Sequence, residues 1–490
     1  MRRLFSFFLS LLLLFIVCSC TKTDYRSVIP ADATLVASVD MRSIAEKSDI
    51  GASDMMKKVR DVVLSSVKDD EADKIGAFLS APSELGIDFT ERVYIFKMRD
   101  GLMGAVMKVY DADRLDAALD VMSNMGLATG KKKNFGMSVG ELMDDCSYAF
   151  DGDIMLLVAS MEGRPHSYRL KAMERLVESG EENAFITSDT YTEMTSRGNN
   201  DICFYGTMSV LPDDVRNTLR TVLPKGTDAR CLGDVIFDNG KAVLRCSLSG
   251  ADESSEKALD DLNGKFRRLG GDYKDMCRDE SSAWLMLGVD GKWMLETIKK
   301  NESTRMSLVA VERVIDAEQI LRSVDGDMSV VFPCRENVND SSLEFVAKAH
   351  VVDGKFMDDV DDWRQSLAGT GMRMNPKGNG MYEVVGDGLS FVWGLNGADF
   401  MVSTSSSQME DCGKTPNCPD DISDHILYMY INPSTLGWSQ PKGNDLTAGL
   451  EDLNKTVTSV VVKAKTVRDY EVCVTVKDGN TNVLRQLLLW

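Results

Sequence analysis

Cys20 is the residue of this sequence whose position most directly predicts a chemical fate. It ends the run Val17-Cys18-Ser19-Cys20, which follows two arginines and an apolar stretch from Leu4 to Val17. A basic start, an apolar centre and a short end of small residues are the parts of a secretory signal peptide. We therefore expect residues 1–19 to be removed and the Cys20 thiol to carry a lipid.

The run Val17-Cys18-Ser19-Cys20 resembles the lipobox of bacterial lipoproteins, in which signal peptidase II cuts before a diacylated cysteine. An ordinary cleaved signal, with Cys18-Ser19-Cys20 as its small-x-small end, is the alternative. The apolar stretch is shorter than the about 20 residues that a membrane span needs. Each buried CH₂ of an acyl chain contributes about 0.8 kcal/mol, so two chains would hold the protein on the membrane durably. The expected membrane partner is thus reached through lipidated Cys20.

Histidine, the most common general base, is scarce in this chain. The three histidines, His166, His350 and His425, do not stand at metal-ligand spacing, and no His-Glu-x-x-His or Cys-x-x-Cys pair occurs. Glycine-rich phosphate loops and dinucleotide fingerprints are also missing, and we expect no nucleophile elbow. The sequence therefore predicts no catalytic residue, no metal site, no cofactor and no enzyme. His166 follows Arg-Pro, and we expect it to be exposed at a helix start.

The densest acidic cluster has a structural explanation. Asp358, Asp359, Asp361 and Asp362 fall on the polar side of an expected helix, whose opposite side carries apolar residues. We interpret the cluster as a solvated helix face.

The cysteines are scattered along the chain. Loss of Cys18 and acylation of Cys20 would leave an odd number of thiols among the original 11. Cys203, Cys246 and Cys473 lie in apolar, strand-like runs and are expected to be small buried hydrophobes. Cys412 and Cys418 flank Gly-Lys-Thr-Pro-Asn, and in an oxidising compartment this pair could close a short loop as a disulfide.

The charge balance excludes one class of partner. The net charge is −20, so no global attraction toward nucleic acid is expected. The only compact basic run, Lys131-Lys132-Lys133, is interpreted as a solvated turn. Outside the leader no long apolar stretch occurs, and we expect a soluble body held by its N-terminus.

Similar pieces recur in the same order in the two halves of the chain. A strand ending Val39-Asp40 is matched by one ending Val289-Asp290, each followed by a helical stretch. Helices starting at Asp111 and Asp353 follow pairs of strands, with Asp as the N-cap. Hairpins 147–159 and 389–403 come next, the second turning at Asn-Gly. Strands 202–208 and 426–431 follow, and the segments 235–246 and 460–473 each end on a cysteine.

This order predicts a tandem duplication. We expect a signal peptide over 1–19, a lipidated tether over 20–27, a first α+β domain over 28–270 and its duplicate over 271–490. Each domain would combine antiparallel sheet with inserted amphipathic helices. Residues 483–490 are expected to form a closing helix of the second domain, with Val483, Leu484, Leu487 and Leu488 on its buried side.

All six tryptophans lie in the second half, and five of them precede the terminal residue: Trp284, Trp293, Trp363, Trp393 and Trp438. Exposed, they could stack on sugar rings, which favours a glycan- or peptide-capture lipoprotein as an alternative function. Trp363 and Trp393, however, stand at core-type positions, so packing is the simpler interpretation.

The segment Tyr25 to Ser48, read after the lipobox, contains Ile29-Pro30-Ala31-Asp32-Ala33, the strand end Val39-Asp40 and a helix reaching Glu46-Lys47-Ser48. On these motifs the chain resembles a family of uncharacterised lipoproteins from Bacteroidota. The resemblance implies a location in the cell envelope, anchored in the outer membrane on its periplasmic face or at the cell surface. It carries over no functional residue. The expected function is a non-catalytic binding or assembly protein with an unknown envelope partner, with a hydrolase of unrecognised site as a further alternative.

Overall fold

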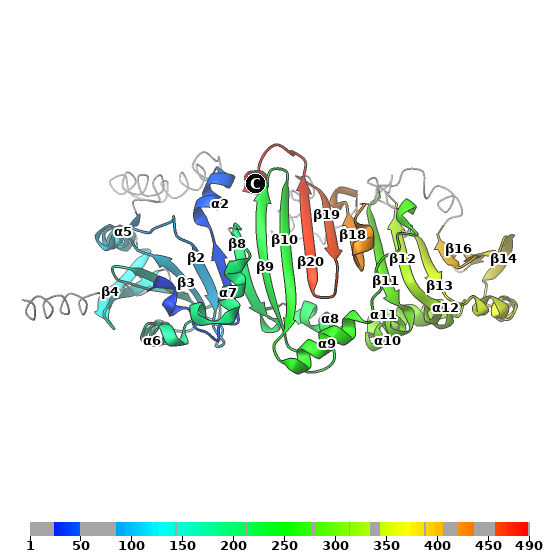
Figure 1. Cartoon of the computed structure of the whole chain (residues 1–490), viewed down its shortest axis with the longest axis horizontal. Helices are drawn as coiled ribbons and strands as arrows, with labels where there is room; N and C mark the ends of the chain where they lie inside the picture. Colours follow the sequence, from blue (N-terminus) through cyan, green and yellow to red (C-terminus); the bar gives the residue numbers. More distant parts are fainter. Residues whose placement is uncertain are drawn as a thin grey trace, which may run out of the picture. The chain divides into compact units, whose positions relative to one another are not determined.

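Antiparallel strands with helices between them make up the described chain (Figure 1). The computed structural model describes residues 24–49, 85–124, 126–142, 145–198, 200–211, 213–276, 281–312, 314–333, 344–386, 389–404, 420–435 and 456–488. Contacts divide the chain into two compact units. The first unit holds the described residues up to Arg42 and those from 85 to Ser196, and the second holds residues 43–49 and those from Arg197 onward. The predicted α+β class is confirmed.

The sheet of the first unit is antiparallel throughout. Its strands are β1 (Leu35–Val39), β2 (Val93–Lys97), β3 (Met103–Lys108), β4 (Ala128–Asn134), β5 (Met137–Leu142), β6 (Cys146–Phe150) and β7 (Ile154–Ala159). They lie in the order β1-β2-β3-β7-β6-β5-β4. β1 alternates half-buried and buried residues, the period-2 pattern expected from its sequence.

Helices cover parts of this sheet. They are η1 (Tyr25–Val28), α5 (Ala112–Asn124), α6 (His166–Glu178), η3 (Glu181–Asn183), η4 (Phe185–Thr187) and α7 (Asp189–Ser196). The predicted helix after Asp111 is confirmed as α5, and the Asp111 carboxylate accepts the Arg114 N–H at 3.1 Å. Leu115 and Leu119 pack with Tyr148 of β6 in one core cluster.

The sheet of the second unit is longer. Its strands are β8 (Ile202–Thr207), β9 (Ala229–Asp238), β10 (Lys241–Gly250), β11 (Ala283–Asp290), β12 (Val324–Phe332), β13 (Val346–Val351), β14 (Arg373–Gly378), β15 (Met381–Gly386), β16 (Leu389–Asn396), β17 (Asp399–Ser403), β18 (Leu427–Ile431), β19 (Val457–Ala464) and β20 (Asp469–Val476). They pair antiparallel in the order β8-β9-β10-β20-β19-β18-β11-β12-β13-β17-β16-β15-β14.

The helices of this unit are η5 (Met208–Val210), α8 (Asp213–Val222), α9 (Glu253–Asn263), η6 (Lys274–Met276), α10 (Gly291–Lys300), α11 (Glu302–Glu312), α12 (Ala317–Ser323), η7 (Lys355–Asp359), α13 (Val360–Ser366), η8 (Ile422–Asp424), η9 (Pro433–Thr435) and α16 (Val483–Leu488). The helix α2 (Met41–Ser48) crosses from the first unit into the second. The hairpin predicted over 389–403 is confirmed as β16 and β17, and its turn residue Gly397 has φ +65°, which glycine adopts without strain.

Aromatic residues fill the core of the second unit. Trp393 is fully buried, with Trp363 and Tyr382 packed against it at ring-centroid distances of 5.6 and 5.5 Å. Trp284 is 3% exposed and stacks on Tyr428 and Tyr430. The prediction that Trp363 and Trp393 are packing residues is confirmed.

The strands β10 and β20 pair side by side along most of their length (Figure 1). Val243 lies opposite Cys473, and Cys246 lies opposite Tyr470. Each of these strands also pairs with the strand before it in sequence, β9 and β19 respectively. Two successive hairpins therefore join through their second strands.

The lysine run predicted as a turn is part of a strand. Lys131, Lys132 and Lys133 belong to β4, whose residues after Ala128 are exposed, and β4 pairs only with β5 among the strands described. Lys131 contacts Asp116 and Asp120 of α5 at 2.7 Å each. The prediction of a turn was wrong because the exposed residues of a strand at a sheet edge can be as polar as those of a turn. β14 is edge-like too: within the described chain it pairs with β15 alone and contains Pro376.

The C-terminal helix is confirmed as α16. Val483 is fully buried and packs with Val457 and Val476, and Leu487 packs against the same cluster. The Asn482 side chain accepts the Leu484 N–H at 3.0 Å and so caps the first turn.

Asp201 anchors α2 in the second unit. Its carboxylate is 3% exposed and accepts the Lys47 ammonium at 2.8 and 2.7 Å, the Ser43 hydroxyl at 2.5 Å and the Phe237 N–H at 2.7 Å. Burial alone raises the pKa of Asp201, but these hydrogen bonds outweigh it and the pKa lies below its ordinary value.

The Asp201→Asn substitution should therefore destabilise the protein most at neutral pH. The folded-state pKa of Asp201 is below the unfolded value of about 3.9. The ionised carboxylate therefore contributes its full stabilisation above about pH 3.9, and this stabilisation is lost as the pH falls through the folded pKa. We expect a loss of about 1.5–3 kcal/mol at pH 7, the usual worth of hydrogen bonds to a charged group. Urea unfolding at pH 7 and pH 3 measures it. Asp261→Asn, at an exposed pair with Lys257, is the control. An equal loss of unfolding free energy in Asp201→Asn at pH 7 and at pH 3 would contradict the role of the ionised Asp201 carboxylate in anchoring α2.

Candidate functional site

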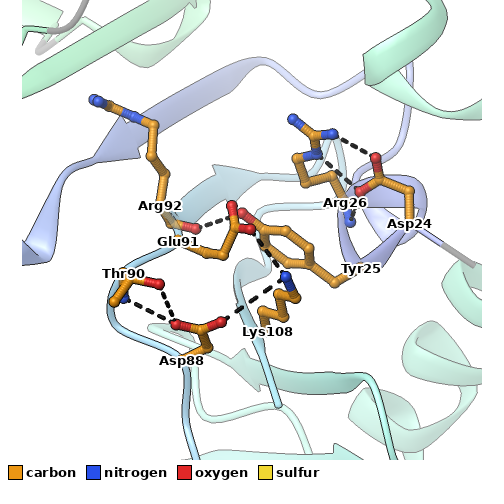
Figure 2. A network of polar contacts seen from close by, with 8 residues as sticks. All are labelled: Asp24, Tyr25, Arg26, Asp88, Thr90, Glu91, Arg92 and Lys108. Carbon is orange, nitrogen blue, oxygen red and sulfur yellow. Dashed lines mark hydrogen bonds and ion pairs between the residues drawn. The ribbon is translucent and has the colours of Figure 1, made fainter. Parts of the chain in front are cut away.

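The N-terminal segment of the described chain folds onto the first unit. Asp24 caps η1 by accepting the Arg26 N–H at 2.9 Å, and Tyr25, Val28 and Ile29 are 7%, 2% and 0% exposed. The end of the segment expected as a tether is therefore packed from Asp24 onward. Around it lies a polar network drawn from η1 with its cap Asp24, from β3 and from the loop before β2 (Figure 2).

Arg26 is held on three sides. Its guanidinium donates to the two Asp24 oxygens at 2.8 and 2.5 Å and to the Tyr191 hydroxyl at 2.5 Å. It also lies 5.7 Å from the ring centroids of Tyr25 and Tyr191. Burial raises the pKa of Tyr191 to about 12. Burial would also raise the pKa of Asp24, but the bonds from Arg26 bring it below its ordinary value. Charge, hydrogen bonding and ring contact thus all fix this arginine.

Tyr25 connects the segment to the sheet. Its hydroxyl donates to the Arg92 carbonyl at 2.8 Å (Figure 2). Its ring meets Tyr94 edge-on at 6.1 Å. The Arg92 side chain contacts β1, where it donates hydrogen bonds to the Ser38 hydroxyl at 2.5 Å and to the Ser38 carbonyl at 2.9 Å. Burial raises the pKa of Tyr25, so the phenol is neutral and acts as a donor.

The outer part of the network is a surface ion cluster. Lys108 lies 2.9 Å from Glu91 and 3.8 Å from Asp88, and Asp88 accepts the Thr90 N–H at 3.1 Å. The bond from Glu91 raises the pKa of Lys108. Exposed pairs of this kind contribute about 0–1 kcal/mol each. Since the charged groups of Figure 2 neutralise one another, the network suits holding a segment better than reacting with a substrate.

A hollow of about 430 Å³ lies beside this segment in the first unit. Its lining is largely apolar, with Pro30, Met98 and Leu176 among the contributors. Arg99 pairs with Asp32 at 3.2 Å and Arg175 with Asp100 at 3.6 Å at its margin. The volume falls within the range of small-ligand sites, but its arginines are already paired with carboxylates.

One constellation combines residue types found in hydrolases. The Ser147 hydroxyl and the Glu141 carboxylate both approach Nδ1 of His166, at 2.8 and 3.2 Å. A catalytic relay instead places the nucleophile and the carboxylate on opposite ring nitrogens. Ser147 is fully buried, and its hydroxyl accepts the Arg169 Nε–H at 2.8 Å.

The same residues form a cage around a buried arginine. Arg169 is 1% exposed and donates to Ser147, to Glu141 at 2.9 Å and to the Arg164 carbonyl at 2.7 Å. The expectation that His166 is exposed was wrong, because this cage holds its ring and leaves the side chain 24% exposed. Burial lowers the pKa of His166. The arrangement satisfies a buried charge and offers no nucleophile.

A second hydrolase signal is present in the sequence and was not expected. Gly136-Met137-Ser138-Val139-Gly140 matches the letters of the Gly-x-Ser-x-Gly nucleophile elbow. That motif needs a sharp strand-to-helix turn that exposes the serine. Here Ser138 lies within β5, opposite Phe150, and is 5% exposed. The match is therefore a strand sequence and not an elbow.

The predicted site residues have different outcomes. Cys20, Cys412 and Cys418 lie outside the described residues. The aspartates of the 358–362 cluster are exposed on η7 and α13, as predicted. Cys203 is buried as expected, whereas Cys246 and Cys473 are only half-buried, because they lie in strands with partly exposed faces.

The described residues contain no group of three or more His, Cys, Asp or Glu placed to hold a metal ion. Within the same residues no helix is long and apolar enough to cross a membrane.

Comparison with known proteins places the sequence in a family. The model of the family described as "Domain of unknown function (DUF4836)" matches residues 25–422. The chain belongs to the DUF4836 family. The match begins at Tyr25, the residue that joins the N-terminal segment to the sheet, and supports the predicted membership of an uncharacterised family. A comparison with curated proteins found no match for this DUF4836 chain.

Solved structures give only distant likenesses. Crystal forms IV and I of the protein TP0453 match with a TM-score of 0.29 each, at 11% and 8% sequence identity. They cover 46% and 51% of the DUF4836 chain and 81% and 90% of TP0453. Crystal form III matches with a TM-score of 0.28 at 8% identity, over 51% of this chain and 91% of TP0453.

Proposed function

We propose that this DUF4836 protein is a lipid-anchored protein of the bacterial cell envelope that acts by binding or assembly and not by catalysis. The docked segment that begins at Asp24 carries the proposal. Only Thr21, Lys22 and Thr23 separate it from Cys20, so the span from the lipidated residue to Asp24 is at most about 14 Å. An acyl anchor at Cys20 would therefore hold the first unit next to the bilayer surface.

Two observations support a non-catalytic role. The Ser147–His166–Glu141 constellation has the wrong geometry for a relay, and Ser138 lies inside a strand. The ion cluster around Lys108 and the arginine Arg26 have partners within the protein.

The proposal includes a body made of two copies of one domain, over 28–270 and 271–490. The sheet order β11-β12-β13-β17-β16-β15-β14 repeats the order β1-β2-β3-β7-β6-β5-β4 of the first unit. In both series a helix, α5 or α13, lies between the third and fourth strands in sequence. β8 to β10 and β18 to β20 supply the remaining strands of each copy. This agreement supports duplication at the predicted boundary near Gly270.

The capture of glycans by exposed tryptophans receives little support. Trp284 and Trp393 are buried, Trp363 packs against the same core as Trp393, and Trp293 meets Phe266 edge-on at 5.2 Å. Within the described chain these side chains give no open stacking surface. A binding role would more naturally use the hollow beside Pro30 in the first unit.

Metabolic labelling with a fatty-acid analogue tests the anchor. The wild-type protein should be labelled and should fractionate with membranes, because two acyl chains hold it there. Cys20→Ala should lose both the label and the membrane association. Cys18→Ala is the matched control and should keep them.

Equal labelling of wild type and Cys20→Ala would refute the anchor. Crosslinking in intact cells tests for a binding partner. A discrete protein that is crosslinked to the wild type but not to Cys20→Ala supports a binding role close to the membrane. Hydrolysis of an envelope polymer by the purified protein would contradict the non-catalytic proposal.

A further inference from the structure

Two cysteines of the second unit lie on the same face of one hairpin. In the register of β9 and β10, Cys231 is opposite Leu248 and Cys246 is opposite Gly233. The two cysteines are therefore diagonal neighbours across adjacent strands, which share a face in an antiparallel sheet. Both are half-buried free thiols.

The two thiols are within hydrogen-bonding reach of each other. Cys231 donates a hydrogen bond to the sulfur of Cys246, and this contact is the largest cause of the lowered pKa of Cys246 and of the raised pKa of Cys231. The Arg197 guanidinium favours the thiolate further, and its position is fixed by Asp234 at 3.4 Å and by the Ser247 hydroxyl at 2.5 Å. Cys246 is thus the more readily ionised thiol of the pair and the one expected to attack.

Aromatic side chains lie around Cys246. Gly233, opposite Cys246, has no side chain, and the ring of Phe204 occupies that space. Tyr470 lies opposite Cys246 on the other neighbouring strand. Cys246 therefore lies near the rings of Phe204 and Tyr470.

We propose that Cys231 and Cys246 are a redox-active dithiol that closes to a disulfide between β9 and β10. The oxidant is a small or protein disulfide, such as oxidised glutathione in vitro. The Cys246 thiolate attacks one sulfur of glutathione disulfide, forming a mixed disulfide and releasing one glutathione thiolate. Cys231 then loses its proton to solvent and attacks the Cys246 sulfur, which releases the second glutathione. Two cysteine thiols are oxidised and one glutathione disulfide is reduced.

The diagonal register predicts a reversible bond. Diagonal neighbours have Cα atoms about 7–8 Å apart, slightly more than the 4.4–6.8 Å of most disulfides, so the strands must draw together locally. Disulfides under such strain are reduced more easily than structural ones. The bond would therefore respond to redox conditions, and its use in cells rests on the proposed oxidising envelope location.

Glutathione redox buffers with the purified full-length protein in detergent provide the test. In glutathione disulfide, the thiols of Cys231 and Cys246 should stop reacting with an alkylating reagent. Peptide mass spectrometry should then find the Cys231–Cys246 disulfide. Excess reduced glutathione should restore both. Cys231→Ser should instead accumulate glutathione on Cys246. Cys473→Ser, a half-buried cysteine of β20, is the matched control and should keep the link.

Full alkylation of both cysteines in oxidised wild type would overturn the proposal. So would a stable glutathione adduct on wild-type Cys246 without the link. This experiment uses purified protein and no membrane, so its failure is distinct from a failure of lipid labelling at Cys20.

Discussion

Deletion of residues 483–490 is expected to lower the free energy of unfolding by roughly 3–6 kcal/mol, because Val483 and Leu487 leave a packed cluster and each buried side chain contributes about 1.5–3 kcal/mol. Val483 is fully buried against Val457 and Val476. A loss of this size is a large part of a typical margin of about 5–15 kcal/mol. Urea unfolding of the full-length and truncated proteins gives the difference.

Arg485→Ala is the matched control for this deletion. Arg485 belongs to the same helix, but its side chain is 52% exposed and pairs with Asp49 at 3.3 Å. Surface pairs of this kind contribute about 0–1 kcal/mol. If the truncated protein unfolds at the same urea concentration as wild type, α16 does not close the core of the second unit.

Tyr25→Ala should release the N-terminal segment from the first unit. Truncating a buried aromatic side chain to alanine typically costs about 3–5 kcal/mol, and the hydroxyl bond to the Arg92 carbonyl is lost as well. Every 1.4 kcal/mol is a factor of ten in an equilibrium. The Ser27 and Ile29 amides, hydrogen-bonded to Asp24 and Arg26, should therefore exchange with solvent at least about a hundredfold faster. Hydrogen exchange with mass spectrometry measures this.

Tyr25→Phe separates the ring from the hydroxyl. It keeps the edge-on contact with Tyr94 and should cost only about 0.5–1.5 kcal/mol, the net worth of one hydrogen bond. Unchanged exchange in Tyr25→Ala would contradict Tyr25 as the main anchor and would leave Arg26 and the buried Val28 and Ile29 as the residues that hold the segment.

Local sequence patterns predicted the elements well. The apolar spacing of Leu115 and Leu119 indicated α5, Asn396-Gly397 indicated the β16–β17 turn, and Val483 and Leu487 indicated α16. These features depend on neighbours in sequence, where periodicity and turn chemistry determine the structure. The α+β class followed from their alternation.

Features that depend on long-range register were not predicted. The docking of Tyr25 on Arg92 and the cage around Arg169 join residues far apart in sequence. The Cys231–Cys246 contact depends on which residues of β9 and β10 face each other, and a shift of one residue would place the thiols on opposite faces. A signal was available, since a two-residue Asn239-Gly240 turn pairs Asp238 with Lys241 and so sets the register of the two cysteines, but the prediction did not use it.

The edge strands β4 and β14 have a consequence for the solution behaviour of the protein. An edge strand offers unpaired N–H and C=O groups to which another chain can add, the first step of aggregation. β4 presents Lys131, Lys132 and Lys133 and a register shift before Lys132, and β14 presents Pro376 and Lys377 with a shift after Pro376. Lysines that repel one another, a proline without an N–H and irregular pairing all discourage such addition. These two edges of the long antiparallel sheets therefore resist the strand addition that would build fibres.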